Sequence, residues 1–158
     1  MNDAPFLISV IIPFYNARDF VIQAVESALS EPETGEVIVV EDGSPDGGIE
    51  ILRELEKKYP KVRLLRHADE GNHGAAAARN LGIQHAQFPF VAFLDADDYY
   101  LPGRFTNTRE ILLSDPSVDG VYNAMGAHFQ TEEDRILFRK TFLREITTVT
   151  KKIPPEKL

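Results

Sequence analysis

Short apolar runs alternate with helical patterns through the first hundred residues, and this alternation constrains the fold more than any other feature. The four runs are Leu7–Ile12, Glu36–Val40, Val62–Leu65 and Phe90–Leu94. The first is almost continuously apolar, as in a strand buried on both faces, and we expect Pro13 to end it. Strands separated by helices at this interval predict βαβ crossovers. The fold class is therefore α/β, with a mainly parallel sheet and helices on both faces.

Three helices are predicted between these strands. Asn16 is a suitable N-cap for the first, in which apolar residues recur at helical spacing from Phe20 to Leu29. The second carries apolar positions from Ile51 to Tyr59 and cannot continue through Pro60. The third covers residues 75–86 and begins with small side chains. The segments that follow the strands then meet at one edge of the sheet, where open α/β sheets bind ligands.

Three carboxylates, Asp95, Asp97 and Asp98, follow the fourth run directly. Such closely spaced like charges repel one another, and a divalent cation would neutralise them. Asp95 and Asp97 alternate along an extended segment, so their side chains point toward one side. Asp98 suits the cap of a helix that has Pro102 in its first turn. A solvated turn with a capping aspartate is the alternative interpretation.

Two further motifs follow strands at the same predicted edge. They are Pro13-Phe14-Tyr15-Asn16 after the first strand and Glu41-Asp42-Gly43-Ser44 after the second. Taken singly, Asp42 suits a turn and Tyr15 suits the core. Convergence of all three motifs in one crevice is stronger evidence for a binding site than any single motif.

Composition narrows the classes of function. The chain has 158 residues, of which 43% are hydrophobic, and its net charge of -8 argues against nonspecific attraction to nucleic acid or anionic lipid. It has no cysteine, which excludes disulfides and thiolate metal sites, and its four histidines lack metal-ligand spacing. No apolar run approaches the length of a membrane span, and the first residues lack the basic region of a signal peptide. We expect a cytoplasmic protein, with peripheral contact to a membrane as an alternative.

The sequence after Asp98 is harder to interpret. Apolar residues from Phe105 to Leu113 predict a helix, and Gly120–Asn123 predicts a strand. Residues 127–130 and 135–139 are suited to a hairpin around the acidic turn 132–134. From Leu143 onward the chain is polar and has no convincing core period.

Four motifs in order carry a resemblance to a known family. They are Ser9-Val10-Ile11-Ile12-Pro13-Phe14-Tyr15-Asn16, Glu36-Val37-Ile38-Val39-Val40-Glu41-Asp42-Gly43-Ser44, Gly74 with Ala78-Arg79-Asn80, and Phe93-Leu94-Asp95-Ala96-Asp97-Asp98. In this order and spacing they resemble a family 2 glycosyltransferase over residues 7 to 125. The resemblance implies a GT-A fold and transfer of a sugar, with inversion, from a nucleoside diphosphate donor. It assigns residues 1–142 to the nucleotide-sugar-binding domain and residues 143–158 to a polar tail or to the start of a truncated acceptor region.

The resemblance also implies roles for single residues. Asp97 would hold Mg²⁺ or Mn²⁺ against the diphosphate, and Asp95 would contact the ribose or share the metal. Asp42 would accept a hydrogen bond from the nucleobase, most simply uracil of a UDP-sugar, with the ring of Tyr15 packed on the base. Arg79 would contact phosphate oxygens. Pro13 and Ala96 complete the predicted donor-binding set.

No catalytic base is identified, because no segment after Tyr122 matches the family carboxylate that deprotonates the acceptor. Glu132, Glu133 and Asp134 are acidic but suit a charged turn. The implied partners are a nucleotide sugar and a glycan or lipid-linked acceptor, in polysaccharide or surface-glycan synthesis; the oligomeric state is open. Two alternatives remain: a noncatalytic sugar-nucleotide-binding module, and a DxD phosphatase of the haloacid dehalogenase type, which places its motif on the first strand.

Overall fold

The computed structural model describes residues 5–123, 126, 129 and 131–142. The chain divides into two compact units, residues 1–110 and 111–158. The first unit contains a sheet of four strands in the order β3-β2-β1-β4, and every strand pair is parallel. The strands are β1 (Ile8–Phe14), β2 (Thr34–Glu41), β3 (Val62–Arg66) and β4 (Phe90–Phe93). The predicted parallel sheet is confirmed.

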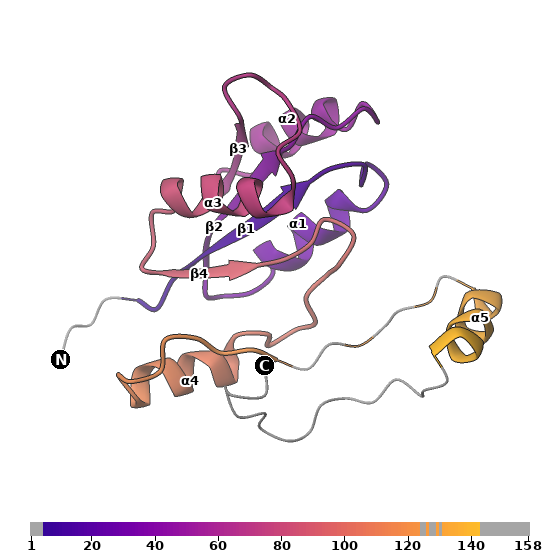
Figure 1. The fold of residues 1–158 in the computed structure, drawn as a ribbon. Helices are drawn as coiled ribbons and strands as arrows, with labels where there is room; N and C mark the ends of the chain where they lie inside the picture. The colour runs from indigo at the N-terminus through magenta and orange to yellow at the C-terminus, as the bar shows by residue number, and fades with distance from the viewer. Residues whose placement is uncertain (1–4, 124–125, 127–128, 130, 143–158) are drawn as a thin grey trace. The chain divides into compact units, whose positions relative to one another are not determined.

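Helices cover both faces of this sheet, as the sequence predicts (Figure 1). They are α1 (Val21–Leu29), α2 (Ile49–Lys58) and α3 (Ala75–His85). One core cluster joins α1 and α2 to the even-numbered residues of β1, and a second joins Ala78 of α3 to Ile11 and Ile38. Because both faces of β1 are covered, all seven of its residues are buried. This explains why its sequence is apolar without alternation.

Pro13 does not end β1, as the sequence analysis expected, but lies within it. The strand continues to Phe14, and Pro13 pairs in register with Val40 of β2. On the other side, pairing with β4 ends at Ile11, whose carbonyl accepts the amide of Leu94 at 3.1 Å. Backbone groups alternate sides along a strand, so the nitrogen of Pro13 points to the side where β4 has already ended. Its missing N–H therefore costs no ladder hydrogen bond.

The order of the strands reverses between β1 and β4. The chain builds outward from β1 to β2 and β3, and then returns to place β4 on the opposite side of β1. Adjacent crossovers that run in opposite directions leave a crevice beyond the carboxyl ends of the two strands, where α/β sheets bind ligands. The segments after β1 and β4 are therefore expected to form the binding site.

Helix α4 (Thr106–Ser114) spans the boundary of the two units, and α5 (Glu132–Phe142) lies in the second. Asp98 does not cap α4, because the helix begins eight residues later. The segment Gly120–Asn123 is not a strand.

The predicted hairpin is also wrong, since residues 135–139 lie in α5. The hydroxyl of Thr131 accepts the amide of Asp134 at 3.1 Å, and the Asp134 carboxylate accepts the amide of Thr131 at 3.2 Å. This reciprocal capping starts a helix where the acidic residues had suggested a turn. Ala127, His128, Gln130 and residues 143–158 lie outside the described residues, and the predicted domain boundary at residue 142 stays a prediction.

Within residues 5–123 and 131–142, no helix combines the length and the apolar character needed to cross a bilayer.

Candidate donor-binding site

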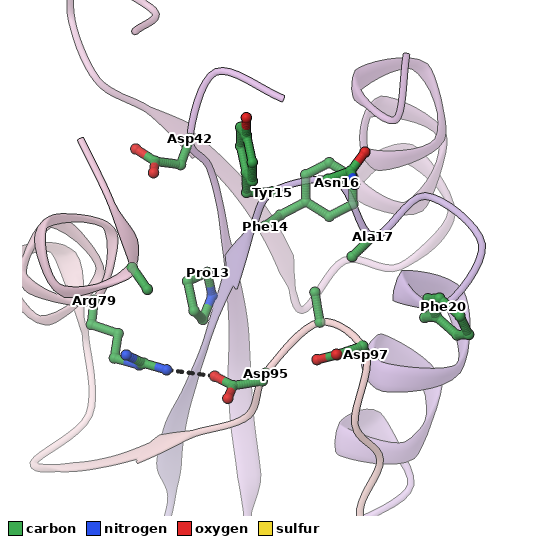
Figure 2. Close-up of a pocket in the computed structure, with 12 residues that line it drawn as sticks. Pro13, Phe14, Tyr15, Asn16, Ala17, Phe20, Asp42, Arg79, Asp95 and Asp97 are labelled. Carbon is green, nitrogen blue, oxygen red and sulfur yellow. Dashed lines mark hydrogen bonds and ion pairs between the residues drawn. The ribbon is translucent and has the colours of Figure 1, made fainter. Parts of the chain in front are cut away.

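A pocket of about 250 Å³ lies at the carboxyl edge of the sheet. Its lining comes from the end of β1, from the segments after β1, β2 and β4, and from the first turns of α3. All seven residues that the sequence predicts for donor and metal binding line it: Pro13, Tyr15, Asp42, Arg79, Asp95, Ala96 and Asp97. Figure 2 shows Asp42 and Tyr15 at one end of the pocket and Asp95 and Asp97 at the other. The structure thus brings the predicted residues together, while their individual roles remain predictions.

Side chains alternate in direction along the segment after β4, so that the carboxylates of Asp95 and Asp97 point into solvent. Ala96 is 4% exposed and packs in the core, whereas Asp95 and Asp97 on either side of it are exposed. Loss of hydration, and then the negative charges of Asp97 and Asp95, raise the pKa of the Asp98 carboxyl. The three carboxylates therefore repel one another in the folded protein, as the sequence predicts.

Arg79 reaches from α3 toward Asp95, and its Nη2 lies 2.5 Å from Asp95 Oδ1 (Figure 2). Both side chains stay partly exposed, at 33% for Arg79 and 52% for Asp95. The guanidinium fork can therefore meet a ligand in the pocket while it balances one of the carboxylates. This is the only pairing within the predicted set that the described residues show.

Asp42 is 2% exposed, and its carboxylate binds the loop that precedes α3. One oxygen accepts the amide of His73 and the other accepts the amide of Gly74, each at 2.8 Å. Gly43 makes the close approach of this loop feasible: it has φ +67, and a Cβ there would lie 2.7 Å from the amide nitrogen of Asn72. In this structure Asp42 lines the pocket and holds the loop that leads into α3, and its predicted contact with a nucleobase remains a prediction.

The expected N-cap role of Asn16 is wrong, because α1 begins at Val21 and Asn16 has a left-handed φ of 52. The backbone amide of Asn16 donates instead to the hydroxyl of Ser44, at 2.8 Å, and this bond links the segment after β1 to the segment after β2. That hydroxyl donates in turn to Asp46 Oδ1 at 2.7 Å.

Asp46 does not line the pocket but supports the segment after β1 that does, and the sequence analysis missed it. Its carboxylate also accepts the amides of Gly48 and Arg18, each at 2.9 Å. Burial alone would raise the pKa of Asp46, but the hydrogen bonds from Ser44, Gly48 and Arg18 hold it below its ordinary value. An aspartate four residues after Asp42 in a glycine-rich turn was a signal for such a bridge between loops.

Metal binding at this site would depend on few protein ligands. In the part of the chain that the structure describes, no three His, Asp or Glu side chains are grouped to hold a metal ion. The exposed carboxylate of Asp97 nevertheless suits Mg²⁺ or Mn²⁺, which are hard cations that prefer oxygen. Mg²⁺ commonly uses one or two carboxylates and completes its shell with phosphate and water. The residues present fit a cation of this kind that is shared with a bound diphosphate.

A parallel sheet with helices on both faces and a pocket at its carboxyl edge defines a ligand-binding α/β domain of the doubly wound type. The chain matches the model of the glycosyl transferase family 2 over residues 9–153. It belongs to that family.

Individual relatives agree with this assignment. The succinoglycan biosynthesis protein ExoU of Rhizobium meliloti is 42% identical over 101 residues, which are 64% of this chain and 29% of ExoU. The mannosyltransferase PcManGT from Pyrobaculum calidifontis, solved with GDP-Man and Mn²⁺, has a TM-score of 0.60 and 25% identity over 84% of this chain and 38% of its own. TarS 1-349 of S. aureus, solved with UDP, has a TM-score of 0.60 and 23% identity over 77% of this chain and 40% of its own.

These neighbours confirm the predicted GT-A architecture. The chain spans well under half the length of the curated relatives it matches.

Proposed function

We propose that this chain forms the donor-binding part of a metal-dependent, inverting glycosyltransferase that uses a nucleoside diphosphate sugar. The observation that carries the proposal is the convergence of Tyr15, Asp42, Arg79, Asp95 and Asp97 on one pocket. An aromatic ring, a guanidinium and two exposed carboxylates are the groups needed for a base, a diphosphate and a hard cation. A role in polysaccharide or surface-glycan synthesis is supported by the similarity to ExoU.

The two ends of the pocket suit the two ends of a nucleoside diphosphate. Tyr15 is 52% exposed beside Asp42, so its ring offers a flat apolar face for a base. At the other end Asp97 would hold Mg²⁺ or Mn²⁺, Arg79 would contact phosphate oxygens, and Asp95 would contact the ribose or share the cation. A UDP-sugar is our first choice of donor, since TarS, which shares the fold, was solved with UDP.

The bound cation would supply positive charge against the departing diphosphate. The chain's own residues would orient the donor so that its anomeric carbon faces an acceptor hydroxyl, belonging to a glycan or a lipid-linked sugar. Inversion also requires a base that takes the proton of this hydroxyl, and we assign that role to no carboxylate of the described residues.

Calorimetric titration with UDP, in Mn²⁺ and then in EDTA, tests the donor and metal roles. We expect Mn²⁺ to tighten UDP binding and Asp97→Ala to abolish this gain while the fold is retained. Glu54→Ala on the exposed face of α2 removes one negative charge outside the pocket lining and should behave as wild type. Unchanged affinity of Asp97→Ala in Mn²⁺ would refute the assignment.

A second titration tests the role of Asp42. Asp42→Ala should weaken UDP more than pyrophosphate, because only UDP carries a base. Equal losses for both ligands would show that Asp42 acts only through the loop at residues 71–74.

A noncatalytic binding module remains the second candidate, because no base is assigned. Family membership sets the phosphatase alternative aside. Incubation with a panel of UDP-sugars, Mn²⁺ and candidate acceptors separates the two, since a module would bind UDP without transferring or hydrolysing the sugar.

A further inference from the structure

The acidic segment between Phe93 and Tyr100 has little regular structure to hold it. β4 ends at Phe93, and the segment contains Asp95, Asp97 and Asp98. One hydrogen bond within it runs from the amide of Asp98 to the carbonyl of Asp95, at 3.0 Å. Three carboxylates that repel one another favour a more open segment, so a contact that closes it must oppose this repulsion.

The side chain of Tyr100 makes such a contact. Its hydroxyl donates to the carbonyl of Phe93 at 2.9 Å, so this side chain joins the two residues that flank the acidic segment, Phe93 at the end of β4 and Tyr100 itself. Tyr100 is 9% exposed, and its ring packs edge-on against Phe105, which is 1% exposed. Burial raises the pKa of Tyr100 to about 12, so the hydroxyl keeps its proton and remains a donor at neutral pH.

The backbone of Tyr100 is fixed as well. Its amide donates to the hydroxyl of Ser27 on α1 at 3.0 Å, and that hydroxyl donates to the carbonyl of Ala24 at 2.8 Å. A few residues later the amide of Gly103 donates to the buried carboxylate of Glu31 at 3.0 Å. The end of the acidic segment is therefore anchored on α1, and its beginning is anchored on β1 through Leu94.

We propose that Tyr100 is a positioning residue that closes the acidic segment and thereby holds Asp95 and Asp97 in place for a divalent cation and a diphosphate. Tyr100 is absent from the pocket lining, so it acts through the segment and not by touching the ligand. The inference rests on the proposed function, because it concerns the metal-dependent part of UDP binding.

Tyr100→Phe is the minimal test, because it removes the hydroxyl and keeps the buried ring. One neutral hydrogen bond changes an equilibrium constant by about two- to tenfold, with a central value of about fivefold. We therefore expect Tyr100→Phe to bind UDP about fivefold more weakly than wild type in Mn²⁺ and equally well in EDTA. Ser27→Ala, which removes the acceptor of the Tyr100 amide, should change binding in the same direction.

Tyr59→Phe is the matched control. Tyr59 lies at the end of α2, and its hydroxyl donates to Glu26 at 2.6 Å, away from the pocket. This variant loses a tyrosine hydrogen bond that is shorter than that of Tyr100 and has a carboxylate acceptor, and it should still keep the full Mn²⁺ gain. Thermal unfolding in EDTA checks that each variant is folded.

The outcomes separate the inference from the function beneath it. If Mn²⁺ does not tighten UDP binding to the wild-type chain, the proposed function is overturned and this inference with it. If Mn²⁺ tightens UDP binding by the same factor in wild type and in Tyr100→Phe, the inference is overturned and the proposed function stands. Equal losses in Mn²⁺ and in EDTA would also overturn it, because a merely structural role weakens both.

Discussion

Gly82 sets the distance between α3 and the sheet, and with it the reach of Arg79 into the pocket. Gly82 is buried, and a Cβ placed there would lie 2.4 Å from Cγ2 and 3.1 Å from Cγ1 of Ile11. Carbon atoms in contact normally lie about 3.5–4.0 Å apart, so Gly82→Ala requires a shift of at least about 1.1 Å. Ile11 is fully buried in β1 and its branched side chain is stiff, so α3 must move instead.

Two effects of opposite sign decide the result. Alanine favours a helix over glycine by about 1 kcal/mol, whereas overpacking a core costs about 1–3 kcal/mol. The contact is severe and its partner is rigid, so the upper part of that range applies. We expect Gly82→Ala to lose about 1–2 kcal/mol of unfolding free energy, measured by urea denaturation. We also expect weaker UDP binding, because Arg79 lies one turn away on the same helix.

Ile11→Ala provides the sharpest control, since it removes both clashing carbons. In that background Gly82→Ala should cost nothing or stabilise the protein, which a double-mutant cycle measures directly. Gln84→Ala on the exposed side of α3 should leave stability nearly unchanged. A Gly82→Ala protein as stable as wild type would refute the view that close packing fixes the position of α3.

Three further changes test single carboxylates, one in the sheet, one beside the pocket and one in its lining. Glu36 is 3% exposed, and although burial alone would raise its pKa, hydrogen bonds led by that from Arg63 hold the pKa below 4.5. Glu36→Gln should therefore cost about 1–3 kcal/mol at pH 7 in urea unfolding, and the difference should shrink as pH falls below 4.5; a constant difference would contradict this. Because the pKa of Asp98 is raised, its negative charge destabilises the folded protein above pH 3.8. Asp98→Asn should therefore have a higher melting temperature than wild type at pH 7 in EDTA, and the difference should disappear in acid. A lower melting temperature at pH 7 would contradict this prediction. Asp95→Asn removes the exposed ion pair with Arg79, so the guanidinium becomes free to bind phosphate, and calorimetry should show about two- to fivefold higher affinity for UDP in EDTA. Unchanged affinity would count against competition between Asp95 and phosphate for Arg79.

The strands were predictable because burial on both faces leaves a strong local signal. A parallel strand covered by helices must be apolar at consecutive positions, and β1 and β2 both show this. The site followed from topology, since the carboxyl ends of parallel strands meet at one edge. The convergence of Asp42, Asp95 and Asp97 therefore needed no contact information beyond the strand order.

Features that depend on the neighbours of a strand were not predictable from local patterns. Proline usually ends a strand, yet Pro13 is tolerated because β4 stops two residues earlier on that side. Asn16 is a good N-cap residue in isolation, but the hydroxyl of Ser44 lies 28 positions away in sequence and holds it in another conformation. The error at α5 differs, because the capping pair Thr131 and Asp134 was visible in the sequence and was outweighed by the turn-like acidic run.

The charges of the pocket give a physical reason to expect metal dependence. Arg79 is already paired with Asp95, so its positive charge is largely balanced before any ligand arrives. Asp97 and Asp98 add negative charge at the same edge, on a chain whose net charge is -8. A diphosphate entering this pocket alone would meet repulsion. Burial is the main cause of the raised pKa of Asp98, and the negative charges of Asp97 and Asp95 add to it, so carboxylates already repel one another at this edge. A bound divalent cation would reverse the sign of the local charge, so the same carboxylates that disfavour the free diphosphate would favour its metal complex. Selectivity for the metal-bound ligand would then follow from the acidic segment itself.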